Sequence, residues 1–210
     1  MSIGLFLTLL SGGAWTIVYI DGLRIGLKDK SYAMPLWPLG LNIAWELMYF
    51  ILGLQHDARS HQTVINGIWF LFDIGLLYTY FRYGRKYFPQ GFKTAWFYLW
   101  GILAIAVGFV VQYAFLLEFD GMLAATYAAF LQNLLMSVLF IHMLVQRGTR
   151  EGQTMLIAVS KFIGSLAPTI SAGILGAGPF GEPLRFVLII GSLMAVFDVI
   201  YIVMLARVKR

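Results

Sequence analysis

Seven long apolar stretches constrain the fold of this chain more than any other feature of its sequence. They lie at about residues 3–20, 35–54, 64–81, 95–117, 122–145, 154–175 and 184–206. Each has the roughly 17–25 residues that a helix needs to cross a bilayer. The chain is 60% hydrophobic and only 12% charged, against about 25% charged residues in a typical soluble domain. The sequence therefore predicts an all-α integral membrane bundle of seven transmembrane helices.

Lysine and arginine are distributed unevenly over the segments that connect these stretches. The first connection, "DGLRIGLKDK" (residues 21–30), the third, the fifth and the C-terminal tail hold most of them, and the other side has little beyond Arg59 and Arg185. Basic connections usually stay in the cytoplasm. We therefore expect an outside N-terminus and a cytoplasmic C-terminus. No linker or clear internal repeat divides the chain, which predicts a single seven-helix domain of residues 1–210.

Four ionisable side chains fall inside the apolar stretches: Glu46, Asp73, Lys161 and Asp198. Each costs about 2.5–3.5 kcal/mol at a helix centre on insertion scales, so each needs a partner or a function. Lys161 is close to the predicted cytoplasmic end of its helix, and we expect its side chain to snorkel to the membrane surface. At 1.5 Å per residue the three carboxyl groups lie within about 10 Å of one depth.

Polar and aromatic residues accompany these carboxyl groups at helical spacing. Asn42 lies four residues before Glu46, and Trp69 lies four residues before Asp73. This spacing places the side chains of each pair on one helix face. The fourth and fifth stretches add polar side chains at a similar depth, namely Gln112, Tyr127, Gln132, Asn133 and Ser137. The pattern predicts a polar site inside an aromatic-rich cavity.

Buried carboxyl groups suggest a particular chemistry. A low dielectric favours the neutral form of a carboxyl group, and a second carboxylate nearby favours it further. A neutral acid beside an anion is the arrangement that general acid catalysis needs, and aromatic faces stabilise a cation. Together these groups are suited to a carbocation reaction of an apolar chain in a site that excludes water.

Other interpretations of the same residues remain open. A buried carboxyl group can simply bridge helices through hydrogen bonds, and Tyr19, Tyr83 and Tyr87 lie at span ends, where aromatic belts are usual. Carboxyl groups at the membrane midplane also serve proton-coupled transporters, which often show internal repeats or interrupted helices. A seven-helix sensor or assembly subunit is a third alternative, and it would lack an enclosed apolar pocket beside the carboxyl groups.

Several chemistries lack their sequence motifs. The chain has no cysteine, which excludes disulfides and thiolate chemistry. DDxxD and DxxxD are absent, so the acidic clusters that hold magnesium and a diphosphate are missing. HExxH and GxSxG are absent as well, and the last stretch contains no lysine that could bind retinal. No basic patch on a soluble domain points to nucleic acid.

Two segments resemble the integral-membrane terpene cyclases of meroterpenoid and indole-terpenoid biosynthesis. They are "PLGLNIAWELMYFILG" and, with its late carboxylate, "MAVFDVIYIVML". The most specific part is N-x-x-W-E, here Asn42, Trp45 and Glu46, and the resemblance covers the whole chain in length and span order. These are small seven-helix enzymes of fungi and some bacteria. The resemblance maps the essential Glu and Asp of the family onto Glu46 and Asp198.

The resemblance implies a class II-like cyclase that works by protonation, an intramolecular lyase or isomerase of secondary metabolism. An acid protonates the terminal epoxide or alkene of a prenyl chain on a polar head, and a cation cascade closes the rings. No metal, cofactor or diphosphate loss is implied. Some bacterial relatives form drimane-type rings on farnesylated indole cyclodipeptides, so such a substrate, and a bacterial cytoplasmic membrane as location, are our working hypotheses.

In this scheme Glu46 or Asp198 donates the proton, and the other raises its acidity or orients it. The resemblance does not say which is the donor. The expected partners of the protein are the lipid bilayer and a prenylated small molecule. The residues expected to shape the site, polarise it or stabilise the cation are Asn42, Trp45, Tyr49, Trp69, Asp73, Tyr127, Asn133, Phe197 and Tyr201.

Overall fold

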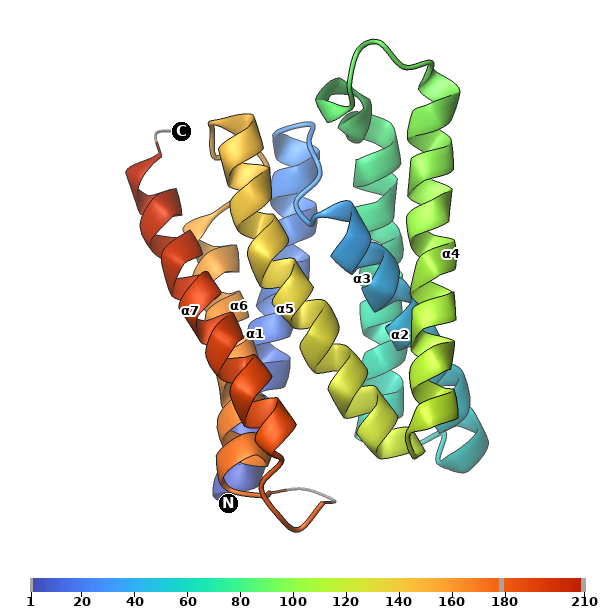
Figure 1. Cartoon of the computed structure of the whole chain (residues 1–210), viewed down its shortest axis with the longest axis vertical. Coiled ribbons are helices and arrows are strands. Elements are labelled where there is room, and N and C mark those ends of the chain that lie inside the picture. The colour runs from blue at the N-terminus through green and yellow to red at the C-terminus, as the bar shows by residue number, and fades with distance from the viewer. Residues whose placement is uncertain (1, 178–179, 209–210) are drawn as a thin grey trace.

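The computed structural model describes residues 2–177 and 180–208. These residues form α1 (Ile3–Lys28), α2 (Leu36–His56), α3 (His61–Tyr83), α4 (Thr94–Glu118), α5 (Gly121–Arg147), α6 (Met155–Pro168) and α7 (Arg185–Arg207). A 3-10 turn, η1 (Gly84–Tyr87), extends α3, and a π-helical turn, η2 (Thr169–Ile174), extends α6. With these extensions the described residues contain seven helices long and apolar enough to cross a membrane. The predicted all-α bundle of seven transmembrane helices is confirmed (Figure 1).

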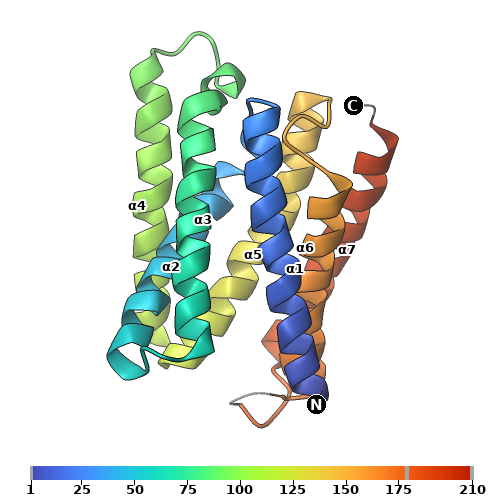
Figure 2. The ribbon, with the colours of Figure 1, turned by 180° about the vertical axis from the view of Figure 1, so that it is seen from behind.

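The seven helices divide into two groups that α5 joins. Figures 1 and 2 show α2, α3 and α4 in one half of the bundle and α1, α6 and α7 in the other. α5 runs obliquely between them and packs against α2 and α4 on one side and against α7 on the other. α1 and α3 also pack against each other across the two halves. Because α5 contacts both groups, its side chains reach polar residues in both halves.

α1 is longer than the sequence predicted. The polar connection expected from residue 21 is helical as far as Lys28. Asp21 does not end the helix, because its carboxylate finds partners inside the bundle. Arg24 Nε donates to Asp21 Oδ1 at 2.7 Å, and the Thr154 hydroxyl donates to Oδ2. Asp21 is therefore buried, and it fastens the start of α6 to α1.

α2 begins nearer the middle of the bundle than the ends of its neighbours (Figure 1). The chain between α1 and α2 folds inward, so that Ala33 and Met34 are each only 2% exposed. Pro35 is the residue before the first helical residue, Leu36, and its missing N–H costs no hydrogen bond of the helix there. The late start of α2 leaves α3, α4 and α5 to extend beyond it at this end.

Glycines bring α2 and α4 into backbone contact. A Cβ atom at Gly108 would lie 2.3 Å from the carbonyl oxygen of Gly40, and one at Gly40 would lie 2.5 Å from that of Ala104. Small residues four apart allow such close approach between membrane helices. The contact fixes the position of α2, the helix that carries Asn42 and Glu46, against α4.

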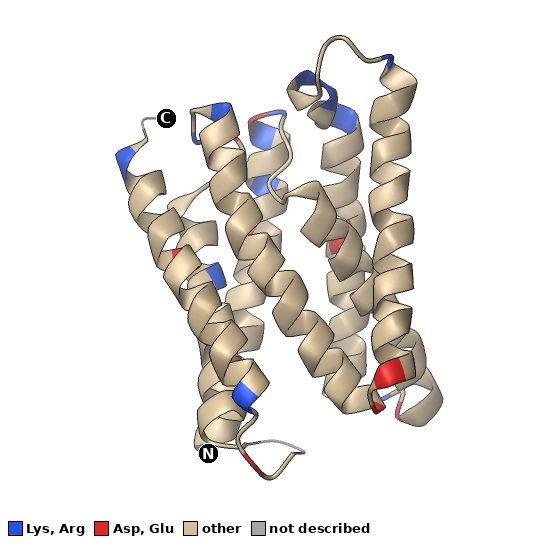
Figure 3. Cartoon of the chain, viewed as in Figure 1, with Lys and Arg blue, Asp and Glu red and all other residues tan. Residues whose placement is uncertain are grey.

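Lysine and arginine gather at the end of the bundle where α1, α5 and α7 finish (Figure 3). We call this the basic end. It contains the connection between α1 and α2, the η1 turn and the connection between α5 and α6. The other end carries several acidic residues, such as Glu118. This asymmetry is the one from which a cytoplasmic C-terminus is predicted, and the orientation stays a prediction.

Candidate active site

Asn42 is the centre of a buried polar cluster formed by α1, α2, α3, α4 and α5. Its side-chain nitrogen donates to Asp73 Oδ2 at 2.8 Å and to the Tyr19 hydroxyl at 2.5 Å. Gln132 Nε2 donates to Asn42 Oδ1 at 3.0 Å, and Gln112 Nε2 donates to Gln132 Oε1 at 2.8 Å. The amide groups thus form a chain of donors that ends on the carboxyl group of Asp73. Tyr19 is 2% exposed, so its interpretation as part of an aromatic belt is wrong.

Glu46 lies one turn beyond Asn42 on α2, and its side chain completes what we call the carboxyl cluster: Tyr19, Asn42, Glu46, Asp73, Gln112 and Gln132. Glu46 and Asp73 are 2% and 0% exposed, and Asp73 is hydrogen-bonded to Asn42, one turn from Glu46 on α2. Glu46 Oε2 and Asp73 Oδ1 have no hydrogen-bond partner among the described residues. No ion pair within residues 2–177 and 180–208 includes either group. Burying two charged carboxylates without a nearby cation is costly, so at least one of the two groups is best accommodated as the neutral acid.

Asp198 belongs to a different buried cluster, and its partner is a cation. Lys161 Nζ lies 2.7 Å from Asp198 Oδ1 and donates to Ser137 Oγ at 2.6 Å. Lys161 is 0% exposed, so the prediction that it snorkels to the membrane surface is wrong. The carboxylate and the hydroxyl satisfy its ammonium group inside the bundle, which removes the need to reach water. We call Ser137, Lys161 and Asp198 the ion-pair cluster.

The two clusters lie on different parts of α5. Gln132 reaches the carboxyl cluster and Ser137 reaches the ion-pair cluster. The two residues are five apart, or about 7.5 Å along the helix axis. This agrees with the similar depth predicted for the three carboxyl groups. Glu46 and Asp198, which the sequence predicted to act as a pair, nevertheless have different partners in the structure.

The aromatic residues predicted near the carboxyl groups have different surroundings in the structure. Trp69 belongs beside the carboxyl cluster, because its ring centroid lies 5.7 Å from that of Tyr19. Trp45 donates from Nε1 to the carbonyl oxygen of Ala125 at 2.9 Å, and its ring lies 4.9 Å from that of Tyr49. Trp45 therefore joins α2 to α5, and both residues are half-buried.

Three of the remaining predicted residues have other neighbours. The Tyr127 ring lies 4.3 Å from Phe186 and 5.3 Å from Phe119. This places it in an apolar cluster where α5 and α7 begin, and not beside either carboxyl group. Tyr201 follows Asp198 on α7, but its hydroxyl donates to Gln153 Oε1 at 2.9 Å. Phe197 is half-buried on α7.

Asn133 is next to Gln132 on α5 and is half-buried. Its Oδ1 atom has no hydrogen-bond partner among the described residues. Its backbone carbonyl accepts a hydrogen bond from Ser137 Oγ at 3.0 Å. Asn133 therefore lies between the two clusters and holds the serine that contacts Lys161.

A cavity of about 320 Å³ lies between α2, α3, α4 and α5 toward the basic end. Half of its lining residues are aromatic, including Tyr32, Trp37, Tyr80, Tyr87, Phe97 and Trp100. The sequence did not predict this cavity. Tyr87 lies near the end of a span, where tryptophan and tyrosine have the same sequence pattern whether they face lipid or a pocket, and it was therefore predicted to belong to an aromatic belt. We call it the aromatic pocket.

Comparison with known proteins agrees with these features. The family model of Pyr4-like transmembrane terpene cyclases matches residues 1–210. The chain belongs to this family. The predicted family membership is therefore confirmed, and with it a multi-pass membrane protein of the terpene cyclase type. No solved structure matches the chain significantly.

Three relatives named as terpene cyclases are 28–34% identical to the chain over the matched residues. It is 34% identical over 162 residues to the Pyr4-family terpene cyclase mfmH of Annulohypoxylon moriforme, covering 76% of this chain and 66% of mfmH. It is 28% identical over 165 residues to the terpene cyclase atmB of Aspergillus flavus, covering 77% of this chain and 66% of atmB. It is 31% identical over 160 residues to the terpene cyclase dpmpB of Macrophomina phaseolina, covering 75% of this chain and 65% of dpmpB.

The matched part of the chain spans 65–66% of the length of these three relatives. All three are fungal proteins, so they give no support to the prediction of a bacterial cytoplasmic membrane.

Proposed function

We propose that this chain is a terpene cyclase that starts ring closure by protonating the end of a prenyl chain. The prenyl chain is attached to an aromatic or indole head, as in a farnesylated indole cyclodipeptide, whose cyclisation gives drimane-type rings. The observation that carries the proposal is the carboxyl cluster, in which Glu46 and Asp73 are buried together without a cation. Membership in a cyclase family favours this function over a proton-coupled transporter or a sensor.

Glu46 is the proton donor in this scheme. The amide chain from Gln112 through Gln132 and Asn42 donates toward Asp73. Hydrogen bonds donated to a carboxyl group favour its charged form, so we assign the charge to Asp73 and the proton to Glu46. Glu46 Oε2 is buried and has no hydrogen-bond partner among the described residues, and in this scheme it is the oxygen whose proton goes to a bound alkene or epoxide.

The step balances without a metal or an oxidant. The proton leaves Glu46, and the electron pair of the terminal alkene forms the new C–H bond, which leaves a tertiary carbocation. With an epoxide, the ring oxygen takes the proton and its C–O bond breaks. Glu46 and Asp73 are then both anionic, and their charge stabilises the cation while successive alkenes attack it. Loss of one proton from the final cation gives the cyclic product.

Asp198 has a later role in the same scheme. A carboxylate already paired with an ammonium group is poorly suited to hold a proton before the reaction, and Lys161 pairs with Asp198 at 2.7 Å. Asp198 Oδ2 has no hydrogen-bond partner within the described residues. We assign this oxygen to accepting the proton released in the last step, with Lys161 as a positioning residue. Both acids exchange protons with water between turnovers.

Glu46→Gln tests the proposal. The variant keeps the shape of the side chain and removes the acid, and general acid catalysis contributes about 10²–10⁴-fold to rates. Purified protein in nanodiscs is incubated with a farnesylated indole cyclodipeptide, and cyclised isomers are separated by chromatography and identified by NMR. We expect turnover to fall by about 10²-fold or more. Glu118→Gln, at an exposed position, is the matched control. A Glu46→Gln variant with the wild-type rate would show that Glu46 is not the acid.

A further inference from the structure

The aromatic pocket is walled by rings from α2, α3 and α4, from the connection before α2, and from the η1 turn and the residue after it. The Trp37 and Trp100 rings meet edge to face, with centroids 5.2 Å apart and an interplanar angle of 88°. Tyr80 stacks on Phe97 at 4.9 Å. Aromatic rings prefer such offset and edge-to-face contacts with other rings. A pocket with these walls is therefore suited to a flat aromatic ligand more than to a flexible alkyl chain alone.

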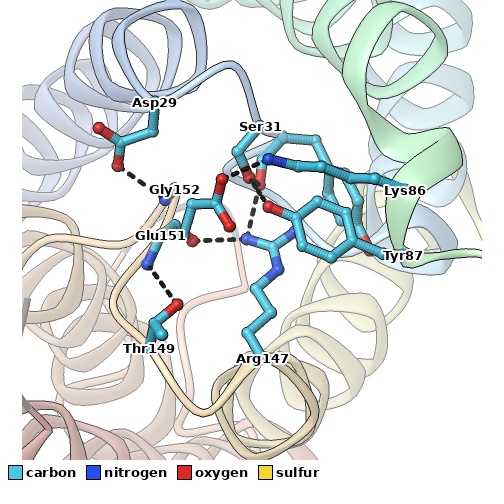
Figure 4. A network of polar contacts seen from close by, with 9 residues as sticks. Asp29, Ser31, Lys86, Tyr87, Arg147, Thr149, Glu151 and Gly152 are labelled. Carbon is cyan, nitrogen blue, oxygen red and sulfur yellow. Dashed lines mark hydrogen bonds and ion pairs between the residues drawn. The ribbon is translucent and has the colours of Figure 1, made fainter.

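A fixed polar network supports one side of the pocket. The guanidinium carbon of Arg147 lies 4.3 Å from the centre of the Tyr32 ring and 4.2 Å from that of Tyr87. Arg147 Nη1 also donates to the carbonyl oxygens of Tyr32 at 3.0 Å and Glu151 at 2.7 Å. Figure 4 shows Arg147 and Tyr87 at the centre of this network, with the ion pair of Lys86 and Glu151 beside them. The two tyrosine rings are thus held in place before any ligand binds.

The pocket and the carboxyl cluster are aligned on the same helices. Leu36, Tyr80 and Leu139 line the pocket on α2, α3 and α5. The residues of the carboxyl cluster on those helices, Asn42, Asp73 and Gln132, are six or seven positions away. At 1.5 Å per residue, all three helices give a separation of about 10 Å. An extended farnesyl chain is long enough to span this distance.

The size and the surroundings of the pocket fit one part of a prenylated substrate. Its volume of about 320 Å³ is within the range of about 300–1,000 Å³ for small-molecule sites. His142 and Gln146 border the pocket and are exposed, so polar groups of a ligand can stay near the membrane surface. The reacting end of the chain is the one farthest from the head, and it must reach the acid.

We infer that the aromatic pocket binds the flat aromatic head of the prenylated substrate. The prenyl chain then runs along α2 and α5 and presents its terminal alkene or epoxide to Glu46. This inference rests on the proposed function. It adds the place of the head group and the direction of the chain, and it makes an aromatic head part of what the enzyme recognises.

Binding to an inactive variant tests the inference separately from catalysis. In the Glu46→Gln background, the affinity for a farnesylated indole is measured by isothermal titration calorimetry in nanodiscs. Leu139→Trp fills the pocket, and Trp37→Ala removes one wall. We expect each change to weaken binding at least 10-fold. Trp96→Ala, which removes a tryptophan that is 57% exposed on α4, is the matched control and leaves the affinity unchanged.

A second ligand separates the head from the chain. Farnesol has the prenyl chain and lacks the aromatic head, so its weaker binding is expected to change less than 3-fold in Trp37→Ala. Val145→Trp adds the same ring to α5 at a position that is 60% exposed and does not line the pocket, so it keeps the affinity for the farnesylated indole. Unchanged binding of the farnesylated indole to Leu139→Trp and Trp37→Ala would overturn the inference. Wild-type protein that binds this ligand in the pocket and forms no cyclised product would instead refute the proposed function.

Discussion

Replacing Lys161 with methionine has a cost that can be worked out from the ion-pair cluster. The ammonium group lies 2.7 Å from Asp198 Oδ1 and 2.6 Å from Ser137 Oγ, and the side chains of Lys161 and Asp198 are 0% and 1% exposed. Methionine keeps the unbranched chain and removes the charge and both contacts. Asp198 would then be buried without any cation. Removing one partner of a buried ion pair costs about 3–5 kcal/mol, so we expect the free energy of unfolding to fall by this amount.

The assay is reversible unfolding in mixed micelles with increasing sodium dodecyl sulfate, followed by circular dichroism. Lys93→Met, at an exposed position before α4, is the control and changes stability by less than about 0.5 kcal/mol. The double variant Lys161→Met/Asp198→Leu leaves no buried charge, so its loss is much smaller than the sum of the two single losses. If Lys161→Met costs less than about 1 kcal/mol, or if the single losses add, Lys161 and Asp198 do not form a coupled buried pair.

Three further predictions concern other parts of the molecule. Asp73→Asn removes a charge that stabilises the developing cation in the proposed scheme. In the farnesylated-indole assay it should lower kcat at least about 10-fold, which is about 1.4 kcal/mol of activation free energy, and leave KM unchanged. An unchanged kcat would limit Asp73 to bridging helices. Gly108→Ala places a Cβ atom 2.3 Å from the carbonyl oxygen of Gly40 and should cost about 1–3 kcal/mol of stability by overpacking, whereas Gly13→Ala, which meets no atom within 4 Å, should cost nothing in the same unfolding assay. Burial raises the pKa of Glu151, but hydrogen bonds from Lys86 and Tyr87 and the charges of Lys86 and Arg147 outweigh it, so this pKa lies below its usual value. The stabilisation from Glu151 is therefore present above about pH 4.3 and lost as the pH falls through the lowered pKa. This stabilisation is under about 1 kcal/mol because the ion pair is partly exposed. The melting temperature of Glu151→Gln should therefore fall less than that of the wild type between pH 6 and pH 3.

The fold was predictable because hydropathy and length specify membrane helices with few alternatives. Each backbone polar group in a bilayer must be paired inside its own segment, so an apolar stretch of sufficient length becomes a helix. The end of α1 was not predictable in this way. Asp21 and Arg24 are typical of a polar loop in the sequence. The helix continues through them because Asp21 contacts Thr154, which lies 133 residues later in the chain.

Part of the site was predictable for a similar reason. The cost of a charge in the membrane identifies Glu46, Asp73 and Asp198 as residues that need partners, and spacing of four residues places Asn42 beside Glu46. Which helix supplies each partner depends on packing between segments distant in the sequence. Tyr19 was therefore predicted to lie at the membrane interface, although its hydroxyl accepts a hydrogen bond from Asn42. Lys161 was predicted to snorkel, although it pairs with Asp198.

The different partners of Glu46 and Asp198 give the proposed reaction a direction. A proton must be present before the substrate arrives, and two buried carboxyl groups without a cation retain one. A proton acceptor must be empty when the last cation forms, and a carboxylate paired with Lys161 meets this condition. α5 contacts the carboxyl cluster through Gln132 and the ion-pair cluster through Ser137. A substrate that lies along α5 would therefore have its proton donor, Glu46, at one cluster and its proton acceptor, Asp198, at the other. The cascade would run from Glu46 to Asp198.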